Sequence, residues 1–270
     1  GGNPDVKPES TTSSNIGLIL TPKRVPGLRL SLDYLESVRD DAIYTVSAAD
    51  ALALEQDMPW LVARAAPDGH PSGVGPITFI DQRYTNLRRL ASRSVDIHAE
   101  QRIGEVSGGT LLFTLAATRS LSFKVQGANT APSVEQVRNP RASLQSQQLK
   151  WNGNAQLRWE GAQWSYGWSA RYFDYLLVND SQAINLQFQG RDRAPRAFNH
   201  DLNISYRAPA TGGSGLANLA AGAAFTLGVK NVFDRTPRFW YGSASGIAPY
   251  DGGTLMGRTL WFQMRKDFGN

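Results

Sequence analysis

The last long interval between two strand-like stretches gathers the side chains best suited to bind a ligand. It reads DRTPRFWYGSASGIAPYDGG and places Arg238, Phe239, Trp240, Tyr241 and Tyr250 among turn-forming residues. Large aromatic rings on a solvated loop lose apolar hydration when a ligand covers them, and a guanidinium pairs with an anionic group. These five residues are therefore predicted to contact a ligand. The alternative is that the rings pack loop on loop or belong to an aromatic girdle.

Trp60 is a similar candidate in the longest such interval, residues 46–87. The stretch SAADALALEQDMPWLVARAA around it begins with Ser47 as a possible helix cap and continues with good helix formers. A short helix is therefore expected in this loop.

The residues needed for catalysis or for metal binding are missing or scattered. The sequence has no cysteine, and its histidines, His70, His98 and His200, lie far apart. There is no GxSxG motif and no phosphate-binding glycine loop, and GEVSGG reads as a turn between strands. The pair Asp40–Asp41 has no evident acid partner. We therefore predict no enzyme activity, no catalytic residues, no metal site and no cofactor.

The charge pattern also limits the possible partners. The net charge is +5, but the basic residues are dispersed, and the densest cluster, NLRRLASR, is short. This argues against nucleic-acid binding. No apolar run reaches the ~18 residues of a membrane helix.

The strongest structural signal is alternation of apolar and polar residues. In LKWNGNAQLRW, residues 149–159, Leu157 and Trp159 share one face, whereas Gln156 and Arg158 share the other. Since successive strand residues point to opposite faces, such stretches predict strands with one apolar and one polar side. Nine of them are expected, at 11–22, 27–45, 88–103, 108–125, 145–158, 162–177, 197–208, 217–232 and 255–268.

The lengths of the strands and the alternation of short and long connections favour a membrane barrel. Many of these strands reach the ~9–11 residues that a transmembrane strand needs. The connections mostly alternate between short and long, as in barrels with tight turns at one end and long loops at the other. Aromatic residues, assigned to the apolar face at strand ends, resemble barrel girdles: Tyr34, Trp151, Trp159, Trp164, Tyr172, Tyr206 and Trp261. The charged residues of the polar face suit a wet interior.

Three stretches of the sequence resemble known motifs. GNPDVKPES, residues 2–10, is similar to a GNPDLKPE motif that precedes a barrel strand. GVKNVFDRTP, residues 228–237, resembles a penultimate-strand signature, and GRTLWFQMRKDF, residues 257–268, resembles a last strand. All three motifs are those of one family, which this chain resembles: the TonB-dependent outer-membrane receptors. RLASRSVDIHAEQR resembles a further family strand, with Ser94 where glycine is usual. Gly269 and Asn270 follow Phe268, whereas the family usually ends on the aromatic residue.

The resemblance implies an all-β fold, an antiparallel up-and-down meander of about nine long strands that is a segment of a 22-stranded transmembrane β-barrel. Residues 1–270 would form the C-terminal part of that barrel, without the N-terminal plug and earlier strands, and would not transport alone. The implied function is TonB-energised uptake of a scarce small-molecule ligand, such as an iron–siderophore complex. The implied location is the outer membrane of a Gram-negative bacterium, in contact with its lipid.

Two other functions remain open from the residues alone. A passive porin-like barrel would show similar alternation, although the three motifs argue against it. A soluble β protein could bind carbohydrate through exposed Trp and Tyr rings, and it would stay in solution without detergent.

Overall fold

The structure is a computed structural model. It describes residues 2–56, 58–67, 69, 73–127, 132–139, 147–178, 183–209, 220–241, 248 and 255–266. The chain divides into two compact units. Unit 1 comprises Gly1–Ser14, Glu36–Arg93 and Ser122–Glu135; unit 2 comprises Asn15–Leu35, Ser94–Leu121 and Gln136–Asn270. No helix within the described ranges is long and apolar enough to cross a membrane.

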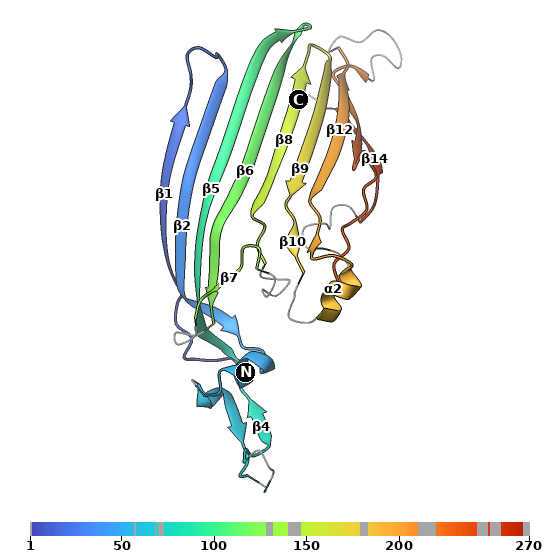
Figure 1. Cartoon of the computed structure of the whole chain (residues 1–270). Helices are drawn as coiled ribbons and strands as arrows, with labels where there is room; N and C mark the ends of the chain where they lie inside the picture. Colours follow the sequence, from blue (N-terminus) through green and yellow to red (C-terminus); the bar gives the residue numbers. More distant parts are fainter. Residues whose placement is uncertain are drawn as a thin grey trace. The chain divides into compact units, whose positions relative to one another are not determined.

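The main sheet confirms the predicted meander. Its nine long strands are neighbours in the order in which they occur in the chain (Figure 1), and the short β7 (Val134–Glu135) pairs with β6 beside this path. The nine strands are β1 (Ser10–Leu20), β2 (Leu28–Thr45), β5 (Tyr84–Val106), β6 (Gly109–Gln126), β8 (Trp151–Glu160), β9 (Trp164–Phe173), β12 (Ala197–Arg207), β13 (Ala224–Lys230) and β14 (Thr259–Arg265).

Several strands are much longer than those of soluble proteins. β2 and β6 each contain 18 residues and β5 contains 23, whereas strands average about 5–6 residues in globular domains. The tight connections predicted by the sequence lie between β1 and β2, β5 and β6, and β8 and β9. In the second of these, GEVSGG, Glu105, Ser107 and Gly108 have positive φ, which confirms it as a turn.

The strand register of unit 2 separates an apolar face from a polar face. Leu157 pairs with Trp168, Trp168 with Leu202, Leu202 with Val229, and Val229 with Leu260, which makes one apolar row across five strands. These side chains are not covered by protein, since Leu202 is 44% and Leu260 71% exposed. The alternate residues define the polar face, on which Arg171 and Asp201 form an ion pair at 3.5 Å.

The assignment of Trp261 to the apolar face was wrong. Trp261 pairs with Gly228 in the row next to the apolar one. A Cβ atom added at Gly228 would lie 2.2 Å from the Trp261 indole, so the ring covers this glycine on the polar face. The error arose because an aromatic residue was assumed to follow the apolar set, whereas the strand alternation places Leu260 and Phe262 on the other side.

Unit 1 contains the helix expected in the loop 46–87, in a shorter form. α1 (Ala48–Ala53) is followed by the 3₁₀ turn η1 (Pro59–Leu61) and by the hairpin of β3 (Val62–Arg64) and β4 (Ile77–Ile80). Pro59 ends any continuous helix because its ring and missing N–H do not fit a helix interior. The local core consists of the buried residues Val46, Ala51, Leu61 and Val62.

Two ion pairs fix this loop. Arg64 donates to Glu55 from Nε at 2.5 Å and from Nη2 at 2.8 Å, and this hydrogen bonding lowers the pKa of Glu55 and raises the pKa of Arg64. Arg83 donates to the nearly buried carboxylate of Asp81, with Nη2 at 2.7 Å, and thereby lowers the pKa of Asp81.

Candidate ligand-binding site

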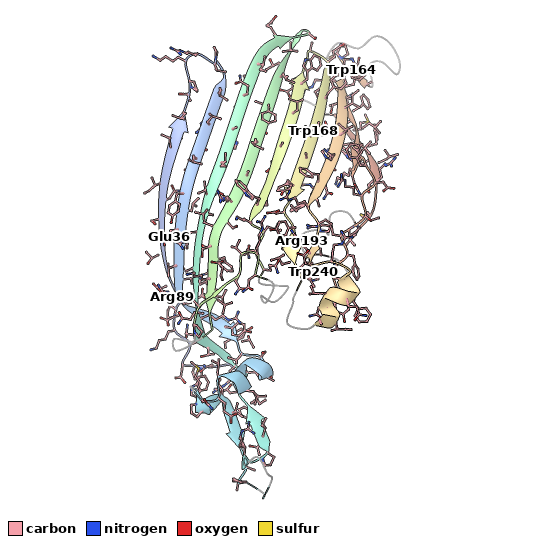
Figure 2. The ribbon with its side chains drawn as sticks, in the orientation of Figure 1. Glu36, Arg89, Trp164, Trp168, Arg193 and Trp240 are labelled. Carbon is pink, nitrogen blue, oxygen red and sulfur yellow. The ribbon has the colours of Figure 1, made fainter. Side chains whose placement is uncertain are left out.

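A small apolar core joins three loop segments of unit 2. The segment before β8 supplies Leu149, and the loop after β13 supplies Trp240 and Ala248. The loop after β9, which also holds α2 (Ala183–Gln189), contributes through β10 (Leu176–Leu177), Val178 and β11 (Arg193–Ala194). Trp240 is only 1% exposed. Figure 2 places Trp240 at this loop end of the unit, whereas Trp164 lies at the opposite end. The cluster members are Leu149, Leu176, Val178, Ala194, Trp240 and Ala248.

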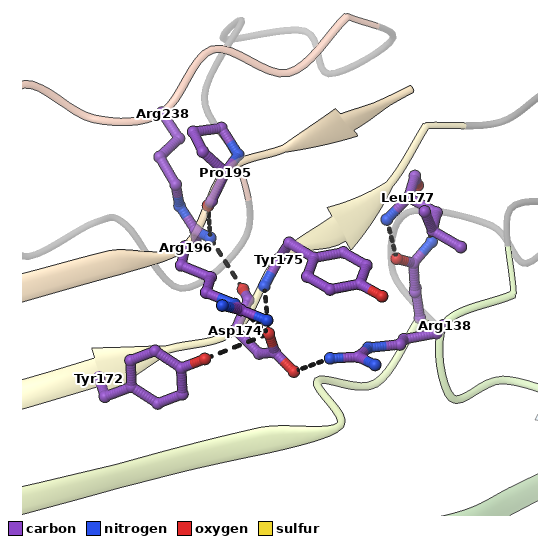
Figure 3. A network of polar contacts seen from close by, with 9 residues as sticks. Arg138, Tyr172, Asp174, Tyr175, Leu177, Pro195, Arg196 and Arg238 are labelled. Carbon is purple, nitrogen blue, oxygen red and sulfur yellow. Dashed lines mark hydrogen bonds and ion pairs between the residues drawn. The ribbon is translucent and has the colours of Figure 1, made fainter. Parts of the chain in front are cut away.

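Beside this core, the buried carboxylate of Asp174 ties the loops together (Figure 3). Arg138 donates to Oδ2, and Arg196 Nε donates to Oδ1 at 3.4 Å. Oδ1 also accepts from the Tyr172 hydroxyl at 3.2 Å and from the Tyr175 N–H at 2.9 Å. A buried carboxylate needs such partners, since an uncompensated charge there is costly. Asp174 therefore holds together the segment before β8, which contains Arg138, and the segment after β9, which contains Arg196.

Arg238 is part of the same arrangement rather than a free cation. Its side chain is buried, and Nη1 donates to the backbone oxygen of Asp174 at 3.0 Å and to that of Pro195 at 2.7 Å. Arg238 thus holds the loop after β13 against the loop after β9, and its positive charge stays near the surface formed by these loops.

Further arginines gather around the ring of Tyr175. The guanidinium carbons of Arg138, Arg193 and Arg196 lie 4.0, 4.7 and 5.8 Å from the ring centre. Arg193 is balanced by Asp192, which accepts hydrogen bonds at 2.7 and 2.5 Å, and this contact lowers the pKa of the Asp192 carboxyl. Cation–π contacts of this kind stabilise the guanidinium groups close to one another.

Between the two loops lies a cavity of about 620 Å³ with a strongly basic lining. This volume is in the range of small-molecule sites. In the described part of the lining, the carboxylate is that of Asp234, which accepts a hydrogen bond from the Arg258 N–H at 2.7 Å. Two exposed phenylalanines add apolar surface, Phe233 at 64% and Phe239 at 52%. Among the described residues, four arginines line the cavity: Arg191, Arg196, Arg235 and Arg238.

This geometry suits an anion with an apolar or aromatic part. Guanidinium groups pair with carboxylate, phenolate or phosphate oxygens, often through two hydrogen bonds. Rings at the rim would lose their hydration on ligand contact. The described residues contain no group of three or more His, Cys, Asp or Glu that could hold a metal ion.

The predicted ligand residues occupy different environments. Arg238 and Phe239 line the cavity. Trp240 is buried in the loop core, and its Nε1 has no hydrogen-bond partner among the described residues. Tyr241 stacks on Phe188 with ring centres 5.1 Å apart. Trp240 therefore supports the loops from within, whereas the Tyr241–Phe188 stack lies at their surface, since Phe188 is exposed.

The structure describes only one of the other two predicted residues. Trp60 is 54% exposed on η1 of unit 1. Tyr250 falls outside the described residues.

The sequence interpretation missed three of the four cavity arginines and Asp174. A signal was present in GRDRAPRA, residues 190–197, where Arg191, Arg193 and Arg196 stand close together in a turn-rich loop. No comparable signal pointed to Asp174, because its partner Arg138 lies 36 residues away with no fixed spacing.

The polar face of unit 2 is itself hollowed and carries the opposite charge. A cavity of about 740 Å³ is lined by residues from β2, β5, β6, β8, β9 and β12. Its carboxylates are Asp33, Asp96 and Asp201, and its cationic side chain is Arg171. The cavity between the loops is therefore basic, whereas this cavity along the strands is acidic.

Comparison with known proteins gives one family match and several similar structures. The model of the family described as TonB dependent receptor-like, beta-barrel, matches residues 1–232. No protein of curated function matches the chain. Among solved structures, a mutant ferric enterobactin receptor from Pseudomonas aeruginosa has 14% sequence identity and a TM-score of 0.54, over 95% of this chain and 31% of that one.

Two further solved structures have similar identities, TM-scores and coverages. A copper transporter has 15% identity and a TM-score of 0.53, over 97% of this chain and 31% of that one. An iron transporter from Neisseria meningitidis has 12% identity and a TM-score of 0.51, over 97% of this chain and 32% of that one. At this level of identity the likeness shows the fold alone. The chain spans about a third of the length of these proteins.

Proposed function

Because the chain belongs to the TonB-dependent receptor β-barrel family, we propose that it is part of an outer-membrane receptor that takes up a scarce ligand into a Gram-negative bacterium. Residues 1–270 would form one segment of the barrel, in its C-terminal part. Further strands, a plug domain and energy delivered through TonB would complete the transporter. Uptake of this kind breaks no bond in the ligand, so it needs no catalytic residues.

The apolar face of unit 2 supports contact with membrane lipid. Its large side chains are exposed rather than packed, which suits a lipid environment and would be unfavourable in water. Aromatic pairs lie near both ends of this face, with Tyr172 and Phe198 4.8 Å apart and Trp164 and Tyr206 4.7 Å apart.

The separation of these pairs fits a bilayer. Phe198 and Tyr206 lie on β12, eight residues apart. At ~3.4 Å per residue this is about 27 Å along the strand, and a tilt of about 40° reduces it to about 21 Å. Membrane barrels carry an apolar band about 25 Å tall between two aromatic girdles. A soluble carbohydrate-binding protein offers no such account of two ring clusters on an uncovered face.

We infer that the ligand is an anionic metal chelate, such as an iron–siderophore complex, bound in the cavity between the loops after β9 and β13. The observation that carries this inference is the lining of four arginines and one aspartate. Phe239 and Phe233 would contact the organic part of the chelate. Trp240, Tyr241 and Arg238 would hold the loops in the binding conformation, and Trp60 and Tyr250 remain proposed contacts.

The test compares binding of two probes to the purified membrane protein. Arg191 and Arg235 have exposed side chains that line the cavity, so the double change Arg191→Ala/Arg235→Ala should leave the fold intact. Its Kd for a trianionic ferric tris-catecholate should rise at least about tenfold, which is ~1.4 kcal/mol. Arg193→Ala serves as control, because this arginine is in the same loop but does not line the cavity.

Two outcomes would contradict the assignment. Equal affinity of the double variant and the control would exclude the cavity as the site. Tight binding of an uncharged chelate, unaffected by either change, would exclude an anionic ligand while leaving the receptor proposal standing.

A further inference from the structure

An arginine lies on the apolar face of unit 2. Arg119 is on β6, where Phe113 pairs with Leu157 of the apolar row. Because alternate residues of a strand point to the same side, Phe113 and Arg119 share this face. Arg119 is exposed, and its guanidinium has no ion pair or hydrogen bond with the described residues. An isolated charge on a surface that contacts lipid is unfavourable unless it reaches a polar partner.

Arg119 lies at the height expected for lipid headgroups. It pairs with Trp151, and the next row toward the turns contains Tyr172 and Phe198, the aromatic pair near the loop end of this face. Arg119 is therefore on the loop side of that pair. Its guanidinium carbon lies 5.5 Å from the centre of the Trp151 ring, and this contact helps to hold the cation there. Long cationic side chains at such a height extend to the headgroups.

The same face carries an apolar cavity on the turn side of Arg119. The cavity has a volume of about 390 Å³, and its lining is mainly apolar, with Leu157 and Trp168 toward the loops. Figure 2 shows Trp168 between Trp164 and Trp240 along the height of the unit. A lining of this kind suits a hydrocarbon chain. Four small residues lie in the two rows between the cavity and Arg119: Ala117, Gly153, Ala155 and Ala170.

We propose that this strip of the apolar face binds one membrane lipid with a phosphate headgroup. The phosphate would contact Arg119, and an acyl chain would lie over the small residues with its end in the cavity. Arg119 and Phe113 are six residues apart on β6. At ~3.4 Å per residue this is about 20 Å along the strand, and a tilt of about 40° reduces it to about 16 Å. One leaflet of a hydrocarbon core ~30 Å thick has a similar depth.

The chemistry of both ends favours a lipid over a free anion. A guanidinium pairs with phosphate oxygens, often through two hydrogen bonds. The Trp151 indole supplies a further N–H group where the headgroup meets the apolar part. A free phosphate would use Arg119 and leave the apolar cavity without an occupant. The inference rests on the proposed membrane contact of this face and not on the identity of the transported ligand.

Photocrosslinking of the full-length receptor in vesicles tests the proposal. The vesicles consist of digalactosyldiacylglycerol, which has no phosphate, with a minor share of phosphatidylglycerol that has the same acyl chains. Leu115→p-benzoylphenylalanine places the probe between Arg119 and the cavity, and Leu260→p-benzoylphenylalanine places it on the same face at β14 as matched control. At position 115, phosphatidylglycerol should exceed its bulk share of the adducts about threefold, as expected of an exposed ion pair. At position 260 it should equal the bulk share.

Three further changes separate the headgroup contact from the chain contact. Arg119→Gln should reduce the share at position 115 to that of the bulk lipid. Arg158→Gln should leave it unchanged, because this exposed arginine lies on the polar face of the adjacent strand. Ala170→Phe should also lower the share, since its ring would occupy the place of the acyl chain.

The outcomes distinguish this site from its alternatives. Bulk composition at both positions, or an enrichment that Arg119→Gln does not change, would overturn the lipid site and leave the membrane contact standing. Inorganic phosphate at constant ionic strength should not remove the enrichment, and its removal would assign Arg119 to a free phosphate instead. The absence of lipid adducts at both positions would overturn the proposed membrane contact as well.

Discussion

Two parts of unit 2 are stabilised in different ways. They are the strand wall, which comprises β8, β9, β12, β13 and β14, and the loop end, which comprises the loops around Asp174 and Trp240. In the wall, one row of side chains from Leu157 to Leu260 repeats a single contact type across five strands, with backbone ladders between them. At the loop end, one buried carboxylate and one buried indole join segments that are far apart in the sequence. The wall is therefore specified by a repeating pattern and the loop end by a few individual residues.

The largest effect should come from a charge on the apolar face. Leu157→Arg should lower the free energy of unfolding by about 2–4 kcal/mol if residue 157 lies near the bilayer midplane. Arg158→Leu, the adjacent residue on the polar face, should cost well under 1 kcal/mol, because an exposed ion pair such as that with Glu160 contributes little. Denaturant titration in lipid vesicles measures both. Equal costs would mean that the two faces do not differ in environment.

The second-largest loss of stability is expected at the loop end. Asp174→Ala removes the acceptor shared by Arg138, Arg196 and Tyr172. Unsatisfied buried donors cost about 1–3 kcal/mol, and the partial exposure of both arginines places this change at the lower end of that range. Since the wall does not depend on these contacts, the loss should be local. Limited proteolysis of the loops should become faster, while the global unfolding midpoint changes little.

Asp174→Asn is the control for this change. The amide keeps the shape and one acceptor oxygen but loses the charge, so its protease sensitivity should fall between those of the wild type and Asp174→Ala. A large fall in the global midpoint with either variant would show that the loops and the wall unfold together.

The sequence predicted the strands of the wall well because apolar and polar residues alternate along them with a period of two, which is easy to recognise. Nine strands, their order in the chain and the two faces followed from alternation, and the family followed from three short motifs. Trp261 was the exception. A single aromatic residue carries no information on its face, and the glycine opposite it in the register is 33 residues away.

The candidate site was harder to predict for a physical reason. Arg238 and Phe239 were identified by residue type, and both line the cavity. Whether a loop aromatic is buried or exposed depends on which other loop it packs against, and this is why Trp240 and Phe239, neighbours in sequence, are 1% and 52% exposed. Asp174 is important because of Arg138 and Arg196, which are distant in sequence and which only the fold brings to its carboxylate.

A smaller loss of stability is expected from a change that tests the contact between the Trp261 ring and Gly228. Gly228→Ala places a methyl group where the indole lies, and overpacking of this kind costs about 1 kcal/mol or slightly more. The double change Gly228→Ala/Trp261→Ala should recover part of this loss in denaturant titration. No recovery would mean that the added methyl group does not clash with the ring.

The smallest effect concerns unit 1, where the Asp81–Arg83 pair holds the hairpin loop. Hydrogen bonds from Arg83 lower the pKa of Asp81, so the folded loop favours the ionised form. The stabilisation is complete above the unfolded pKa of about 3.9 and is lost as the pH falls through the lower folded value. Because the Asp81 N–H donates to Leu61 O at 2.8 Å, loosening should reach η1 and its Trp60. The Trp60 emission, taken as the difference from Trp60→Phe, should therefore change below about pH 4. Asp81→Asn should abolish the transition, and a transition that persists in this variant would assign it to another group.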